Sequence, residues 1–189
     1  MSTYGAPELV NAFRVVRKNT LQIADDIPES QYDFVAAPGC RSVAGLLKHI
    51  AFAATIYYDM HRDRRITTLK GYDFGALTAR TDAAEQQPMS KAEIIALLRA
   101  EGDQFAEWLQ SLPQAFLAET FTDPTGQNPK SRLEHLMGAK EHEMHHRGQL
   151  MLIERLLGVV PHLTREREAR IAARRAAAAA GTAATSGAR

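Results

Sequence analysis

Two histidines spaced four residues apart, His142 and His146, have the side chains and spacing best suited to metal chemistry in this 189-residue sequence. On a helix they lie one turn apart and share a side. That side continues through apolar or small residues: Ala139, Leu150, Ile153 and Leu157. Both imidazoles should therefore point inward, where two unpaired rings would cost about 1–3 kcal/mol each. A shared divalent metal removes this cost by taking a lone pair from each ring, so we favour a metal site over two solvated histidines.

His49 is the candidate third ligand. It lies in the middle of an apolar stretch, Leu46–Ala51, and its neighbours on the same helical side are small or apolar: Gly45, Phe52, Ala53 and Ile56. If the helices that carry His49 and the histidine pair are neighbours, three imidazoles converge. Three His ligands leave positions open for water or substrate, which is typical of a catalytic site. Zinc, nickel, iron and copper all suit such a donor set.

Four residues beside the histidine pair are candidates for supporting roles. Glu143 and His145 are the candidate catalytic residues, because each could transfer protons at the metal if it faced the site. Arg147 and Gln149 are candidates for binding an acidic substrate or cofactor at the rim. For Arg147 a plain surface role is equally expected.

The other histidines have no strong claim as ligands. His135 lies two turns before His142 and is expected at the bundle end. His61 and His162 fall near helix ends, where a polar or capping role is the default. Arg41, just before a helix, is expected to be a solvated turn residue.

A protease is the alternative suggested by the same residues. His142-Glu143-Met144-His145-His146 matches the H-E-x-x-H pattern, in which both outer histidines bind zinc and the glutamate is the general base. However, no strand system precedes the pattern to bind a peptide, and the metzincin continuation is absent. The sequence therefore argues against a zincin-type protease.

Four amphipathic helices are predicted to position these residues, with no convincing strand between them. Apolar spacing and capping signals place them at about 7–24, 42–61, 90–112 and 131–157. Ser42 is the expected N-cap of the second helix, and Ser90 with Glu93 forms a capping box that opens the third. The connection over 62–87 is long enough to hold a short helix or to cover the site. The pattern indicates an all-α four-helix bundle.

Composition sets further limits. One cysteine, Cys40, excludes an internal disulfide and a cysteine-based zinc site. Residues 164–189 hold 11 Ala, six Arg and two Glu, a formal charge of +4 that leaves −3 on the rest of the chain. We therefore expect a bundle over 1–163 and a mobile or weakly helical tail over 164–189. An acidic body gives no case for nucleic acid, and without a signal peptide or membrane span we expect a cytoplasmic protein.

The stretch from Ser42 to Ala51, together with His142-x-x-His145-His146-Arg147-Gly148-Gln149-Leu150, resembles the DinB/YfiT-like family of metal-dependent enzymes. Tyr32-Asp33-Phe34 and Pro38-Gly39 add to a resemblance that covers about residues 7–163. It implies a four-helix bundle of up-down-down-up order, often dimeric, with a divalent metal on His49, His142 and His146. The family's name, damage-inducible, describes expression, and the DNA polymerase of the same name is unrelated.

The resemblance also implies a reaction class, because the family is similar in fold to mycothiol-dependent maleylpyruvate isomerase and to bacillithiol S-transferases. We expect a metal-dependent S-transferase or isomerase that uses a low-molecular-weight thiol and a small-molecule substrate, and that forms a homodimer. A metal ion favours the thiolate, so no protein cysteine is needed, and Cys40 is not expected to be catalytic. The alternatives are a metal-dependent hydrolase and a non-catalytic, metal-binding stress-response bundle.

Overall fold

The computed structural model describes residues 4–186 and is almost entirely helical. Its helices are α1 (Ala6–Asp26), α2 (Val43–Phe52), α3 (Ala54–Tyr57), α4 (Phe74–Glu85), α5 (Lys91–Gln110), α6 (Gln114–Leu117), α7 (Arg132–Leu156) and α8 (His162–Ser186). A 3₁₀ turn spans Glu29–Gln31, and a π-helical segment, Tyr58–Asp63, continues α3. Two short strands, β1 (Thr120–Phe121) and β2 (Lys130–Ser131), pair in antiparallel fashion, although no strand was predicted.

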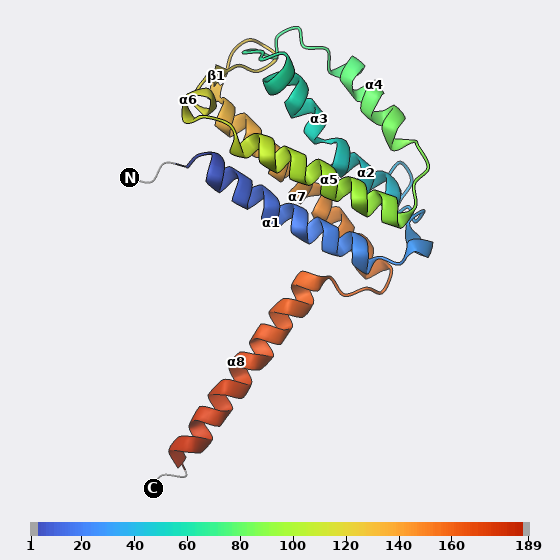
Figure 1. The fold of residues 1–189 in the computed structure, drawn as a ribbon. Helices are drawn as coiled ribbons and strands as arrows, with labels where there is room; N and C mark the ends of the chain where they lie inside the picture. The colour runs from blue at the N-terminus through green and yellow to red at the C-terminus, as the bar shows by residue number, and fades with distance from the viewer. Residues whose placement is uncertain (1–3, 187–189) are drawn as a thin grey trace.

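Four long helical segments, here called rods, form the bundle: α1, the continuous run from α2 to the π-helical segment, α5 and α7. Helix α1 packs against α5 and α7, and α2 packs against the same two helices from the other side. The first two rods along the chain are therefore diagonal. Figure 1 shows that α2 and α5 run in one direction, while α1 and α7 run in the other. The fold is all-α with the up-down-down-up order that the family resemblance implies.

Side-chain caps begin the helices where the sequence predicts them. Ser42 Oγ accepts a hydrogen bond from the Gly45 amide at 3.1 Å. Ser90 and Glu93 form the predicted capping box of α5. Ser131 Oγ caps α7 by accepting a hydrogen bond from the Glu134 amide at 3.1 Å. Each cap satisfies amide groups that the first helical turn leaves without partners, and the cap at Ser42 fixes the start of α2 six residues before His49.

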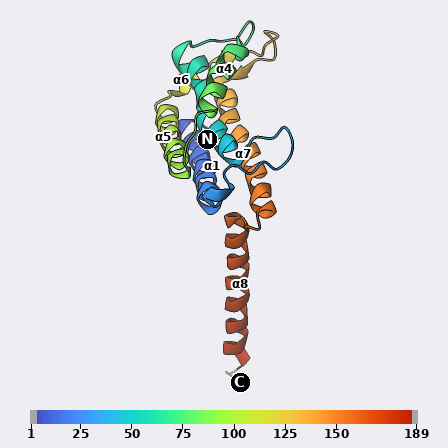
Figure 2. The same cartoon turned by 90° about the vertical axis from the view of Figure 1, so that its right-hand side faces the viewer.

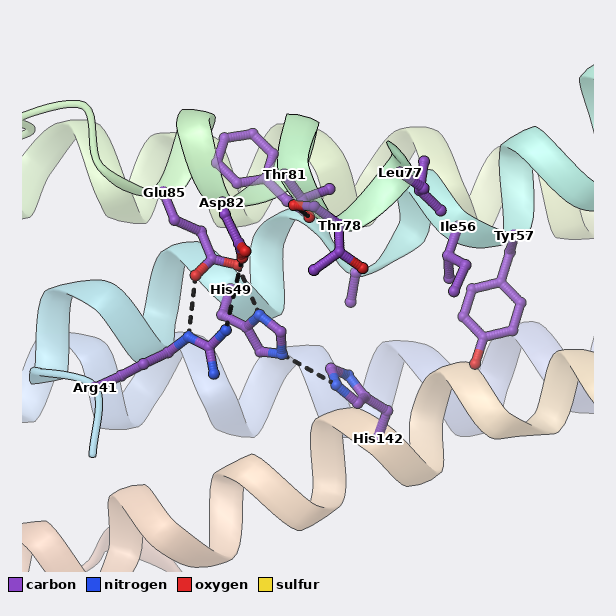
Figure 3. A pocket seen from close by; sticks show the side chains of 12 residues that line it. Arg41, His49, Ile56, Tyr57, Leu77, Thr78, Thr81, Asp82, Glu85 and His142 are labelled. Carbon is purple, nitrogen blue, oxygen red and sulfur yellow. Dashed lines mark hydrogen bonds and ion pairs between the residues drawn. The ribbon is translucent and has the colours of Figure 1, made fainter. Parts of the chain in front are cut away.

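The long connection after the second rod holds α4. Asp73 caps this helix by accepting a hydrogen bond from the Ala76 amide at 3.0 Å. Helix α4 packs against α2, and Figure 3 shows it running alongside the α2–α3 run, with Glu85 directed toward His49. The 62–87 segment thus both contains a helix and covers the candidate site.

The core has two main apolar clusters, one toward each end of the bundle. One gathers around Ile23, Ile50 and Leu98, and the other around Phe13 and Phe105. The ion pair between Arg17 on α1 and Glu143 on α7 is buried in the same interior. A Cβ on Gly102 would lie 2.8 Å from Arg17 Nη1, so the missing side chain makes room for the guanidinium.

Helix α8 leaves the bundle and projects away from it (Figures 1 and 2). Its first turn docks on the bundle, because His162 is buried and Arg165 Nη2 lies 2.6 Å from Asp26 Oδ2 on α1. Residues 165–178 are exposed. The helix therefore begins two residues before the predicted tail and continues to Ser186, as its alanines favour. The tail's mobility stays a prediction, and its last three residues lie outside the described part of the chain. Within the described residues, no helix combines the length and apolar character that a membrane span requires.

Candidate metal centre

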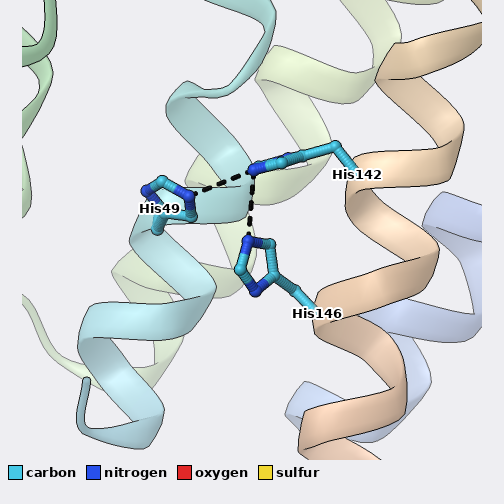
Figure 4. Close-up of side chains that lie close together, drawn as sticks. All are labelled: His49, His142 and His146. Carbon is cyan, nitrogen blue, oxygen red and sulfur yellow. Dashed lines mark hydrogen bonds between the residues drawn. The ribbon is translucent and has the colours of Figure 1, made fainter. Parts of the chain in front are cut away.

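The three predicted ligands meet between α2 and α7. His49 Nε2 lies 3.2 Å from His142 Nε2, and His146 Nε2 lies 3.1 Å from the same atom (Figure 4). All three rings offer a nitrogen within 4.8 Å of the others. The structure therefore brings together His49, His142 and His146, which are separated by up to 97 residues of sequence.

The nitrogen spacing fits one transition-metal ion. With metal–nitrogen bonds of about 2.0–2.1 Å, two nitrogens 3.1–3.2 Å apart subtend an angle of about 100° at the metal. This angle lies between the octahedral and tetrahedral values, so each of these two nitrogen pairs is spaced to bind one ion, and the nitrogens of the third pair, His49 and His146, lie within 4.8 Å of each other. Three protein ligands leave at least one position open.

Hydrogen bonds on the far side of two rings fix which nitrogen faces the centre. His49 Nδ1 lies 2.6 Å from Glu85 Oε1, and His146 Nδ1 lies 2.8 Å from Gln149 Oε1. Both oxygens accept, so each Nδ1 carries the proton and each Nε2 presents a lone pair. His142 Nε2 could donate a proton to only one of these lone pairs. A cation at the centre satisfies all three nitrogens at once, and the residues present therefore fit a divalent metal.

Burial favours the neutral form of His142 and His146. Desolvation, reinforced by the neighbouring histidines, lowers the pKa of His142 to about 4. Burial also lowers the pKa of His146. His142 Nδ1 is buried, and within the described residues it has no hydrogen-bond partner. Neutral imidazole is the form that binds metal.

Glu85 is the functional side chain that the sequence did not single out. It is only 6% exposed, and while Oε1 accepts from His49, Oε2 accepts from Arg41 Nε at 3.0 Å. Arg41 is therefore not a freely solvated turn residue, because it holds the carboxylate that orients a ligand. The one available signal was the 62–87 connection, whose length predicted a cover over the site.

The sequence model of the DinB superfamily matches residues 12–150. The chain belongs to the DinB superfamily. Among solved structures, YfiT from Bacillus subtilis, described as a probable metal-dependent hydrolase with an unusual four-helix bundle topology, is similar with a TM-score of 0.63 and 17% identity over 84% of this chain and 91% of that one. A DinB-like protein from Bacillus cereus has a TM-score of 0.61 and 20% identity over 82% and 94%. No curated protein matches the sequence.

Glu143 faces away from the three histidines of this DinB protein and into the bundle interior. Its carboxylate accepts from Arg17 Nε at 2.9 Å and from Nη2 at 3.0 Å, and it is 2% exposed. It is absent from the lining of the cavity beside the histidines. The side chain that the H-E-x-x-H pattern requires as a base thus forms a buried ion pair, and the candidate role of Glu143 in proton transfer has no geometric support.

The other three supporting candidates lie at or beyond the edge of the DinB centre. Gln149 accepts a hydrogen bond from His146, a candidate metal ligand, and also contacts His145 Nε2 at 3.3 Å. Its side chain is therefore engaged with these histidines and is not free to bind a substrate at the cavity rim. His145 is exposed, with its ring 4.9 Å from that of His146. Arg147 acts electrostatically on His162 at the start of α8, and it does not line the cavity.

Two further histidines form a separate buried pair at the other end of the bundle. Arg132 Nη1 donates to His61 Nδ1 at 2.8 Å, and His61 Nε2 lies 2.8 Å from His135 Nδ1. Because a guanidinium can only donate, His61 carries its proton on Nε2 and donates it to His135. Burial lowers the pKa of His61 to about 3. His61 was expected at a polar helix end, yet it is 1% exposed.

A cavity of about 200 Å³ lies beside the metal centre, between α4 and the α2–α3 run. His49 and His142 line it near one end, and Tyr57 lies toward the other (Figure 3). The open position of a metal held by the histidines would therefore be next to a space large enough for a small organic molecule.

Proposed function

We propose that this DinB protein is a divalent-metal-dependent enzyme that transfers a low-molecular-weight thiol to a small organic substrate, or isomerises the substrate with its help. The observation that supports the proposal is the convergence of three Nε2 atoms, two of them held as lone-pair donors by Glu85 and Gln149. The adjoining cavity supplies room for the substrate. A purely structural metal would instead be closed off by four protein ligands.

The residues of this chain would bind the metal ion and orient the histidine rings that hold it. A divalent cation, when bound, supplies the positive charge that makes a thiol or a water in its open position more acidic. Glu85 holds the His49 ring and Gln149 holds the His146 ring, so the donor set is preorganised. Cys40 is exposed and absent from the cavity lining, so the thiol would come from a second substrate. A thiol needs no further protein base once its proton is readily lost.

Hydrolysis is the second candidate, and Asp82 is the observation that favours it. Asp82 lines the cavity, and its carboxylate is held only loosely, 4.0 Å from Arg41 Nη2. It could accept a proton from water at the centre. YfiT, similar in fold, is described as a probable metal-dependent hydrolase.

Titration of the cobalt-loaded protein with thiols tests the proposal. Cysteine, glutathione and bacillithiol are added to wild-type protein and to a His142→Ala variant while the cobalt absorption bands are recorded. If the protein is a thiol transferase, a thiol should produce a new sulfur-to-cobalt charge-transfer band in the wild-type protein but not in the His142→Ala variant. Unchanged spectra with all thiols, combined with ester hydrolysis that Asp82→Asn abolishes, would favour the hydrolase instead. If the spectra stayed unchanged and no substrate were turned over, both enzymatic proposals would be wrong and a non-catalytic metal-binding bundle would be the remaining interpretation.

A further inference from the structure

The walls of the cavity beside the metal centre are mainly apolar. Phe52, Ala53 and Ile56 line it from the α2–α3 run, and Leu77 lines it from α4. Helix α4 has just two buried side chains, Leu77 and Glu85, and both line the cavity. The helix is therefore seated on the cavity rather than on the bundle core. An apolar space of this kind favours a ligand that buries apolar surface.

Most polar groups in the lining already have partners. Thr78 Oγ1 donates to the Phe74 carbonyl at 2.8 Å, and Thr81 Oγ1 donates to the Thr78 carbonyl at 3.0 Å. Arg41 is bonded to Glu85, which is also bonded to His49. The two threonine hydroxyls have thus used their protons and can only accept from a ligand, whereas Arg41 keeps the N–H groups of its Nη atoms.

Tyr57 is a neutral hydroxyl donor in this lining. Tyr57 lines the cavity, Figure 3 shows its hydroxyl directed toward α7, and among residues 4–186 no hydrogen-bond partner for the hydroxyl is found. The ring is held between Phe105, at 5.9 Å between centroids, and His135, at 5.7 Å. A Cβ on Gly138 would lie 3.0 Å from the hydroxyl oxygen, so the glycine makes room for it. Burial raises the pKa of Tyr57 above its usual value, so the hydroxyl stays protonated and available as a donor.

The charges around the cavity disfavour an anionic ligand. Within its described lining, Glu85 and Asp82 are carboxylates, whereas Arg41 is the one Lys or Arg side chain and lies 3.0 Å and 4.0 Å from those two groups. In the metal-free protein, a negatively charged group entering the cavity would thus meet two carboxylates and one guanidinium that is already paired with them.

We propose that the cavity binds an uncharged, ring-sized apolar group of the substrate, and that Tyr57 donates a hydrogen bond to an oxygen acceptor on this group. The volume of about 200 Å³ is sufficient, because an apolar protein cavity of roughly 150 Å³ accommodates benzene. The proposal rests on the proposed function in one respect: the bound group would lie next to the metal's open position. Tyr57 is then a substrate-binding residue that selects for neutral carbonyl or ether compounds.

Binding of simple probes to the metal-free protein tests this proposal by NMR titration. Acetophenone carries a ring and a carbonyl, benzoate is its anionic analogue, and ethylbenzene lacks the acceptor. Acetophenone should bind at least ten-fold more tightly than benzoate, with shift changes centred on Leu77 and Tyr57. Ala53→Leu and Ile56→Trp, two independent ways of filling the space, should each weaken binding at least ten-fold while the far-ultraviolet circular dichroism stays that of a folded helical protein.

Tyr57→Phe should weaken acetophenone three- to ten-fold, the value of one hydrogen bond, and leave ethylbenzene unchanged. Tyr72→Phe is the matched control, because Tyr72 donates to Asp59 and does not line the cavity; it should change neither ligand. Benzoate binding as tightly as acetophenone, unaltered binding in both filled variants, or equal effects of the two tyrosine substitutions would overturn the proposal. Because these titrations need no metal, their failure is distinguishable from failure of the metal-dependent function.

Discussion

Replacing Glu85 with glutamine should weaken metal binding although Glu85 is not a ligand. Its carboxylate accepts from His49 Nδ1 at 2.6 Å and from Arg41 Nε at 3.0 Å. Glutamine keeps the shape of the side chain but removes the negative charge. The His49 ring then loses a charge-assisted hydrogen bond, which lowers the basicity of Nε2. Arg41 also loses its counter-charge beside a site that must accept a cation.

The structure sets the size of the effect. The path from Glu85 through His49 to a bound ion comprises the 2.6 Å hydrogen bond, the ring and a 2.0–2.1 Å metal bond, a separation of roughly 6–7 Å. A single negative charge at that distance from a dication contributes about 1 kcal/mol in water and about 5 kcal/mol at an effective dielectric constant of 20. Loss of an outer-shell partner typically costs about 10–100-fold in affinity. We therefore expect zinc affinity to fall by about 10–100-fold, or 1.4–2.7 kcal/mol.

Competition with a chromophoric zinc chelator measures this affinity. Asp82→Asn is the matched control, because Asp82 lines the same cavity but is half exposed and 4.0 Å from Arg41, without a bond to any of the three histidines. It should reduce affinity by less than about three-fold. If Glu85→Gln had no larger effect than Asp82→Asn, the hydrogen bond to His49 would not be what prepares the site, and the reasoning would be refuted.

Three other predictions concern the framework of the bundle. Glu143→Gln should lower the free energy of unfolding by about 3–5 kcal/mol, measured in urea, because it leaves Arg17 buried without its counter-charge; a loss below 1 kcal/mol would show that water reaches the pair. Glu154 is fully buried, and its carboxylate has no partner among the described residues; burial raises its pKa to about 7, so its ionisation destabilises the fold as pH rises through 7. Glu154→Gln should accordingly gain about 1–3 kcal/mol over wild type between pH 5 and pH 8 in urea denaturation, and a difference independent of pH would contradict this assignment. Truncation after Glu166 keeps the contact between Arg165 and Asp26 and should leave the melting temperature and metal content unchanged, whereas a large loss would show that the rest of α8 docks.

Much of the metal centre could be predicted because its signals are local. The histidines of α7 lie four residues apart on a side that continues into apolar residues, and His49 lies within an apolar helical face. Helix boundaries were equally local, since Ser42, Ser90 and Ser131 each cap a helix that begins at the next residue. Spacing and caps depend on neighbours along the chain, and a single sequence contains that information.

The partners of these residues could not be predicted, because they depend on how distant segments pack. Glu143 is next to His142 in sequence, but the helical turn directs it to Arg17, 126 residues away. Glu85 reaches His49 only because the 62–87 connection folds back as α4 over α2. Nothing in the sequence near Arg41 signals the carboxylate that it holds. The sequence thus predicted the helix face on which a residue lies, but it did not predict which side chain that residue contacts.

Metal stoichiometry of the untagged protein tests the central claim most directly. Elemental analysis after equilibration with zinc and removal of excess metal should give one ion per chain for the wild type. His49→Ala, His142→Ala and His146→Ala should each lose most of it, while His145→Ala, on the same helix but exposed, should retain it. No bound metal in the wild type, or full retention in a variant lacking all three histidines, would contradict the assignment of this centre.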